Sequence, residues 1–166
     1  MQASTPLGDV VTLVVVGPGD FFGELALLDP ASRRNATVTG LEPAETLVLS
    51  GERFNELRRE KPSVNRVLVE ALAARLLRMT NSRVEALYLP VETRLLHRLI
   101  EVAQEWNWGD ERGRLNLTQE DLAVMAGTTR PTVNRVLQRA AREGAVALGR
   151  GYIDILDLGR LRELAG

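Results

Sequence analysis

The segment that most constrains this chain runs from Thr128 to Ala140, where the sequence TTRPTVNRVLQRA predicts an amphipathic helix. At about 100° per residue, its apolar and polar side chains fall on opposite faces. The apolar face consists of Val133, Val136, Leu137 and Ala140. The opposite face consists of Pro131, Arg135, Gln138 and Arg142, with Asn134 and Arg139 at its margins.

The polar face of this helix has the chemistry of a base-reading surface. Arginine and glutamine are the side chains that form paired hydrogen bonds with the edges of guanine and adenine in the DNA major groove. Thr129 is a suitable N-cap, and a proline in the first turn loses no needed hydrogen bond. An ordinary surface helix is the competing interpretation, because exposed Arg and Gln are common.

The residues on either side favour the DNA-binding interpretation. A first helix is predicted from Leu117, with Thr118 as its N-cap, and Gly127 ends it. Two short helices around a turn that contains glycine form a helix-turn-helix, in which the second helix reads the bases. The apolar stretches 145–148 and 152–156 flank Gly149-Arg150-Gly151, which predicts a hairpin "wing" with Arg150 placed to touch phosphate.

The charge distribution agrees with this placement, although the total charge does not. The chain of 166 residues carries a formal net charge of −1. Residues 112–150 hold seven arginines and three acids, a net charge of +4, whereas residues 1–60 have a net charge of −4. The positive charge is therefore concentrated where the helix-turn-helix is predicted.

Composition excludes several classes of protein and site. The chain has no cysteine, which rules out disulfides and Cys-ligated metal sites and fits a cytoplasmic protein. Its single histidine, His97, cannot build a Ser-His-Asp constellation or a multi-His metal site. No membrane span, secretory signal or enzyme motif is found. We expect neither an enzyme nor a metalloprotein.

The N-terminal part predicts strands at Val10–Val16, Ala36–Thr39 and Thr46–Leu49, separated by glycine turns. Between them lie Gly23-Glu24 and, ten residues after the glutamate, Arg34. A guanidinium and the backbone amides of a short helical turn can hold a phosphate, while a carboxylate accepts from a ribose hydroxyl. A surface ion pair between Glu24 and Arg34 is an equally good interpretation of the spacing.

Residues 62–89 predict one helix of about 40 Å. Its apolar stripe comprises Val64, Val67, Leu68, Ala71, Leu72, Met79 and Ala86, with Arg75 interrupting it. A helix of this length usually pairs with a partner, so we favour a homodimer over a helix that packs only on its own domain. Pro90 ends it and marks a domain boundary. A further helix is predicted over about 91–106.

These motifs together resemble the cyclic-AMP receptor protein superfamily of transcription regulators, from about Val10 to the C-terminus. Phe22-Gly23-Glu24-Leu25-Ala26-Leu27 and Arg34-Asn35-Ala36-Thr37-Val38 resemble that family's phosphate-binding cassette. The resemblance implies a cyclic-nucleotide site with a bound cyclic AMP, an operator DNA, a second copy of the chain and RNA polymerase as partners.

The resemblance also implies roles for individual residues. The nucleotide-binding set it implies is Gly23, Glu24, Leu25, Arg34, Asn35 and Thr80, with Gly23 and Glu24 on the ribose, Arg34 and Asn35 on the phosphate and Thr80 on the adenine. The DNA-binding set is Thr118, Thr129, Arg130, Pro131, Thr132, Asn134, Arg135, Gln138 and Arg150.

Three departures from the family pattern matter. Asn35 stands where the family usually has Ser or Thr. Pro131 replaces an acidic base reader, so the operator should differ there. The opening strands of the sensor barrel are missing, so Val10–Val16 would face an unpaired edge. We therefore expect either that Met1 is not the true start or that this region is rearranged.

The sequence thus predicts an α+β protein in three parts: a partial cyclic-nucleotide-binding β-roll over 1–60, a dimerisation helix over 61–89, and a winged helix-turn-helix over 90–166. Its expected function is that of a dimeric DNA-binding regulator gated by a cyclic nucleotide. A constitutive regulator with a vestigial pocket is the alternative. A nucleotide-binding or interaction module without operator recognition is a third, which the basic reader face argues against.

Overall fold

The computed structural model describes residues 2–4, 10–12, 15–28, 36–105 and 112–166. Its contacts divide the chain into two units. The first unit comprises Met1–Phe22, Asn35–Pro43 and Pro90–Gly166, and the second comprises Gly23–Arg34 and Ala44–Leu89. The domain bounds inferred from the sequence remain a prediction.

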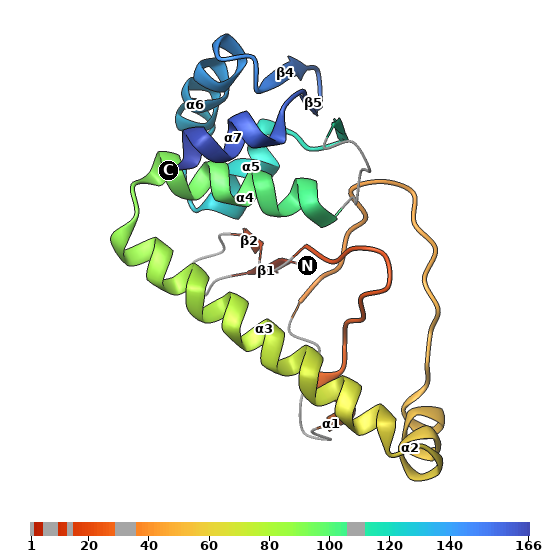
Figure 1. The fold of residues 1–166 in the computed structure, drawn as a ribbon. Coiled ribbons are helices and arrows are strands. Elements are labelled where there is room, and N and C mark those ends of the chain that lie inside the picture. The colour runs from red at the N-terminus through yellow and green to blue at the C-terminus, as the bar shows by residue number, and fades with distance from the viewer. Residues whose placement is uncertain (1, 5–9, 13–14, 29–35, 106–111) are drawn as a thin grey trace. The chain divides into compact units, whose positions relative to one another are not determined.

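Most of the first unit is formed by its C-terminal stretch (Figure 1). Its helices are α4 (Val91–Glu105), α5 (Gln119–Ala126), α6 (Arg130–Arg142) and α7 (Leu158–Ala165). Its antiparallel sheet is formed by β3 (Gly113–Leu115), β4 (Val146–Gly149) and β5 (Tyr152–Ile155), with β5 in the middle. The helix-turn-helix and the hairpin predicted from the sequence are present, and the α+β class is confirmed.

Two elements of the C-terminal stretch of this unit were not predicted. Strand β3 pairs with β5, with Arg114 opposite Asp154, and turns the two-stranded hairpin into a three-stranded sheet. Helix α7 begins after Asp157, whose carboxylate accepts a hydrogen bond from the Arg160 backbone amide at 2.8 Å. Such an N-cap satisfies one of the free amides at a helix start. Helix α7 packs against α4.

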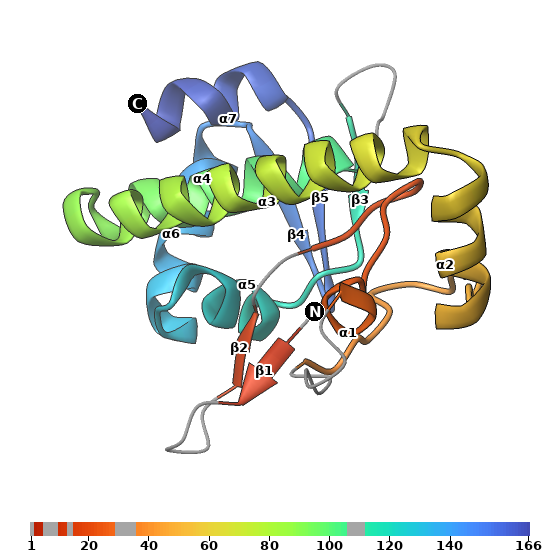
Figure 2. The same ribbon diagram turned by 90° about the horizontal axis from the view of Figure 1, so that it is seen from below.

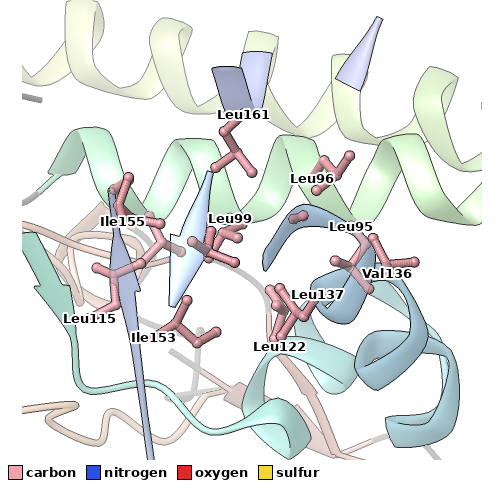
Figure 3. Packing of buried hydrophobic residues seen from close by; sticks show 14 of the residues in the cluster. Leu95, Leu96, Leu99, Leu115, Leu122, Val136, Leu137, Ile153, Ile155 and Leu161 are labelled. Atoms are coloured by element: carbon pink, nitrogen blue, oxygen red, sulfur yellow. The ribbon is translucent and has the colours of Figure 1, made fainter. Parts of the chain in front are cut away.

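A single apolar core joins the helices and the sheet of this unit (Figure 3). Leu95 and Leu99 of α4, Leu122 of α5 and Leu137 of α6 are fully buried in it. Ile153 and Ile155 reach the same core from β5, because alternate residues of a strand point to one face. Each of these helices therefore contributes one apolar face to the core. For α6 this is the face that the sequence predicts.

The N-terminal strands differ from their predictions. Strand β1 (Gln2–Ser4) pairs antiparallel with β2 (Val10–Thr12), so the expectation that β2 faces an unpaired edge is wrong. Strand β2 contacts α5 within the same unit (Figure 2). Val15 and Val16 continue the chain without strand structure.

The other two predicted strands are absent from the described part of the chain. Within 36–39 only Thr37 makes an isolated bridge, and 46–49 has no regular structure. Leu47 and Val48 are 103% and 90% exposed. A strand is stable only when a neighbour takes up its backbone hydrogen bonds along several residues, and the isolated bridge at Thr37 is not enough to make one.

The described residues of the second unit form three helices, α1 (Leu25–Leu28), α2 (Gly51–Glu60) and α3 (Ser63–Tyr88). Helix α2 was not predicted; the Ser50 hydroxyl accepts from the Arg53 amide at its start. Helix α3 has 26 residues and agrees with the predicted rod. It ends at Tyr88, and the following Leu89 is extended because the next residue is Pro90. No helix in the described ranges is long and apolar enough to cross a bilayer.

Candidate functional sites

The start of α5 is held by a capping box. The Thr118 hydroxyl accepts from the Asp121 amide at 3.1 Å, and the Asp121 carboxylate accepts from the Thr118 amide at 3.0 Å. These two bonds satisfy donors that a helix start otherwise leaves free. The pattern Thr-x-x-Asp, read from the sequence as an N-cap with acids in the first turn, therefore fixes where the first helix begins.

Gly127 makes the turn between α5 and α6. Its φ of 59° lies in the left-handed region, which favours glycine, and the Thr128 amide donates to the Ala123 carbonyl at 2.9 Å. Thr129 then occupies the N-cap position of α6, but its side chain makes no capping bond. Its hydroxyl lies 3.2 Å from that of Thr132 instead. The turn is therefore stabilised by backbone hydrogen bonds to the end of α5 and not by a side-chain cap at the start of α6.

Helix α6 is divided into a buried and an exposed face as its sequence predicts. The four apolar residues of its inner face are buried. Arg130, Pro131, Asn134, Arg135 and Gln138 of the predicted DNA-binding set are exposed on the outer face, and Thr132 is half-buried. The side chains able to bond bases thus project from a helix whose other side is anchored in the core.

Three contacts tie this exposed face to neighbouring helices. The Asn134 amide donates to Gln119 Oε1 of α5 at 3.3 Å. Glu92, in the first turn of α4, forms ion pairs with Arg135 at 3.2 Å and Arg139 at 3.7 Å. The sequence did not single out Glu92, because nothing in its local pattern relates residue 92 to residues 43 and 47 positions away.

The wing carries Arg150 at the tip of the β4–β5 hairpin, where its side chain is exposed. Gly151 follows with a φ of 85°. Thr118 and Thr129, at the starts of α5 and α6, are exposed as well. All nine residues of the predicted DNA-binding set therefore belong to the first unit, and their roles remain predictions.

The outer face of the wing sheet holds a stack of three groups. The Arg114 guanidinium lies 3.8 Å from the centre of the Tyr152 ring and bonds both carboxylate oxygens of Asp154, at 2.7 and 3.0 Å. The hydrogen bond from Arg114 lowers the pKa of Asp154, so the pair persists to lower pH than a free carboxylate would allow. Gly149 lies against the same ring, and an added Cβ there would come within 2.0 Å of Cζ.

The second candidate site centres on Glu24, the one charged residue among the described ones that is buried, with 4% of its surface exposed. Its Oε1 accepts from Arg75 of α3 at 2.5 Å. Its Oε2 is also buried and has no hydrogen-bond partner in the described part of the chain. Arg75, which only interrupted an apolar stripe in the sequence, is thus the residue that compensates the buried carboxylate.

The other residues of the predicted nucleotide-binding set have different positions. Gly23 has a φ of 87°, and Leu25 begins α1 with an exposed side chain. Thr80 is exposed on α3, and its hydroxyl donates to the Leu76 carbonyl at 2.9 Å. Arg34 and Asn35 lie outside the described residues. Of the predicted nucleotide-binding set, Glu24 is therefore the residue for which the structure shows a buried and incompletely bonded side chain.

Among the described residues, no group of three His, Asp or Glu side chains is arranged to hold a metal ion.

Both parts of the chain match family models. The Crp-like helix-turn-helix domain model matches residues 93–164, and the cyclic nucleotide-binding domain model matches residues 1–61. A cyclic AMP receptor protein from Thermus thermophilus is 35% identical over 160 residues, which cover 95% of this chain and 71% of that protein. A CRP-like cAMP-activated global transcriptional regulator from Mycobacterium tuberculosis is 30% identical over 96% of this chain and 72% of its own length.

The structure is similar to that of a transcriptional regulator of the CRP/FNR family, also from Thermus thermophilus. The TM-score is 0.70 with 26% sequence identity, and the match covers 99% of this chain and 81% of that one. The likeness extends over nearly the whole chain.

The stack on the wing generates a prediction about Gly149. Gly149→Ala should destabilise the chain by about 1–3 kcal/mol, because the new methyl group overlaps the Tyr152 ring, which must move and lose its packing with Arg114. Urea unfolding followed by circular dichroism measures this loss.

Tyr152→Ala provides the control for that substitution. In its background Gly149→Ala should cost little, since the ring that the methyl group meets is gone. Equal costs in both backgrounds would show that the strain lies in the backbone of the hairpin instead.

Proposed function

Because this chain belongs to the cyclic AMP receptor protein superfamily of transcription regulators, we propose that it is a dimeric, sequence-specific DNA-binding regulator gated by a cyclic nucleotide. The observation that carries this proposal is the exposed polar face of α6, fixed by a buried apolar face within a winged helix-turn-helix. Two of the relatives reported above are regulators of transcription. Contact with RNA polymerase is proposed on the family alone.

Recognition of DNA is argued from the chemistry of α6. The second helix of a helix-turn-helix enters the major groove and presents its N-terminal residues to base edges. Arg130 and Arg135 are exposed on that part of α6, and arginine bonds both acceptors of guanine. Arg150 on the wing and Thr118 at the α5 start are proposed to contact phosphate, which orients the protein without reading sequence.

Pairing of two chains is argued from α3. One line of residues along this helix recurs with alternating spacings of four and three, the pattern of a coiled-coil seam. The seam consists of Val69, Ala73, Leu76, Thr80, Arg83 and Leu87. It lies about 120° around the helix from the apolar stripe on which the sequence-based expectation of a dimer rested. Leu76 and Leu87 are among the exposed large apolar residues of this helix. A second copy would cover them, and two-fold symmetry would present the two α6 helices to half-sites about 34 Å apart.

Binding of a nucleotide is argued from Glu24. A buried carboxylate oxygen without a hydrogen bond costs about 1–3 kcal/mol or more, and a bound ligand that donates to it would remove this cost. A ribose hydroxyl would donate to Glu24 Oε2 while Arg75 stays on Oε1. Arg34 is proposed to hold the cyclic phosphate, as the family pattern implies. Thr80 lies on the same seam of α3, which would put the adenine beside the dimer interface.

The first test concerns base reading by Arg135. Arg135→Ala should weaken binding to an operator duplex by about 5- to 150-fold, with the loss confined to one base pair per half-site. Fluorescence anisotropy with a duplex enriched from a random library, and with its single-base variants, measures this.

Arg162→Ala on α7 removes the same charge outside the proposed interface and should leave affinity nearly unchanged. If Arg135→Ala weakens all duplexes equally, Arg135 contacts phosphate rather than a base.

The second test concerns the nucleotide. Calorimetric titration with cyclic AMP should give a measurable heat, and Arg34→Ala should weaken binding by about 10- to 150-fold through loss of a charge-assisted bond. Arg33→Ala, one residue earlier, is the matched control. No heat, with equal DNA affinity in the presence and absence of cyclic AMP, would favour a constitutive regulator with a vestigial pocket.

The third test concerns the dimer. Leu76→Glu should shift the chain from dimer to monomer in analytical ultracentrifugation, because it puts two like charges across the two-fold axis. Arg78→Glu, which also adds negative charge to α3 but lies off the seam, should remain dimeric. A dimer that survives Leu76→Glu contradicts the proposed pairing.

A further inference from the structure

Glu92 is in contact with the arginines of the reader helix. Its Oε1 lies 3.2 Å from Arg135 Nη2, and its Oε2 lies 3.7 Å from Arg139 Nη1. Arg135 and Arg139 are one turn apart on α6, so their guanidinium groups converge on the same carboxylate. The side chains of Arg135, Arg139 and Glu92 are 69%, 63% and 40% exposed. The cluster therefore lies on the solvent side of α6, where DNA is proposed to approach.

Arg135 and Arg139 together form a site for an anion, and the Glu92 carboxylate of the same chain occupies it. Carboxylate and phosphate are the two anions that arginine forks bind best, and both are bound through the same N–H groups. A phosphate that reaches Arg135 and Arg139 competes with Glu92 for the same two guanidinium groups. A guanine edge that reaches Arg135 competes in the same way, because the terminal Nη2 nitrogen is paired with Glu92.

We propose that Glu92 is an intramolecular competitor of DNA, which lowers the affinity of the reader helix for every duplex. The inference rests on the proposed function, since it assumes that α6 is the DNA-binding helix. Glu92 lies in the first turn of α4, where the helix dipole favours a negative charge. It follows Pro90 by two positions, just after the end of α3.

A supporting role for Glu92, in which it orients Arg135 for base reading, fits the contacts less well. A carboxylate that orients an arginine from behind would engage Nε and leave both terminal nitrogens for the base. Here each arginine is bound through a terminal nitrogen. One carboxylate also serves two arginines, which is the arrangement of a bound anion rather than of a dedicated support.

The exposure of Glu92 and its two arginines sets the expected size of the change in DNA affinity. Ion pairs between solvent-exposed side chains contribute little each, so release of two of them should change affinity by about two- to tenfold. Removing the carboxylate charge also increases the effective positive charge of the interface by about one. The plot of log K against log salt concentration should therefore steepen by about 0.9.

The experiment compares Glu92→Gln with Glu101→Gln in the full chain, with and without saturating cyclic AMP. Glu101 lies on the same helix nine residues later, on the opposite side of α4, and pairs with Arg98. Anisotropy titrations use a duplex of random sequence, about 30 base pairs long, and a duplex enriched by the wild-type protein. Glu92→Gln should raise affinity for both duplexes by the same factor of about two to ten, and Glu101→Gln should change neither by more than about twofold.

Substitution of both arginines tests whether Glu92 acts on DNA affinity through Arg135 and Arg139. In the Arg135→Ala/Arg139→Ala background, Glu92→Gln should no longer change affinity, because the groups for which it competes are gone. An effect of full size in that background would show that the change in overall charge is responsible, and would overturn the proposal.

Two further outcomes would overturn the proposal. Affinities of Glu92→Gln equal to those of the wild type would show that Glu92 does not compete. A loss of affinity confined to the enriched duplex would identify Glu92 as a support for Arg135.

Failure of the proposed function would give results different from failure of the Glu92 proposal. If no sequence is enriched and Arg135→Ala acts equally on all duplexes, operator recognition fails, while the random duplex still tests Glu92. A chain that binds neither duplex refutes both proposals.

Discussion

The packing of the inner side of α6 is the interaction on which the DNA-facing surface depends. Val133 and Leu137 are fully buried in the same cluster as Leu95 of α4 and Leu122 of α5. Cores of this kind are close-packed and leave a helix little freedom to rotate or slide. The outer side chains of α6 therefore project from a rigid base, and their ordering costs less when a partner binds.

Two glutamate–arginine contacts in this protein illustrate how burial decides what an ion pair does. Glu24 is buried, so Arg75 must stay beside it, because an uncompensated charge in an apolar environment is costly. Glu92 and its two arginines are exposed, so water can replace each partner at little cost. The first contact compensates a buried charge, and the second is the contact that we propose DNA displaces.

Local chemistry was a good guide to the C-terminal part of the chain. The capping box at Thr118, the left-handed turn at Gly127 and the apolar face of α6 act over a few residues, and each was readable in sequence. The strands predicted at 36–39 and 46–49 were wrong because a strand depends on a neighbour that the pattern itself does not specify. Strand β3 was missed for the same reason, since its partner β5 lies 40 residues away.

By itself the sequence determined where α3, α5 and α6 lie, the division of α6 into an apolar and a polar face, and the family to which the motifs point. These depend on side-chain periodicity and capping, which short stretches encode. Only the tertiary structure decided which charges meet: Arg75 with the buried Glu24, and Glu92 with Arg135 and Arg139. Charged side chains pair through space, and the chain separation between such partners follows no period that a sequence displays.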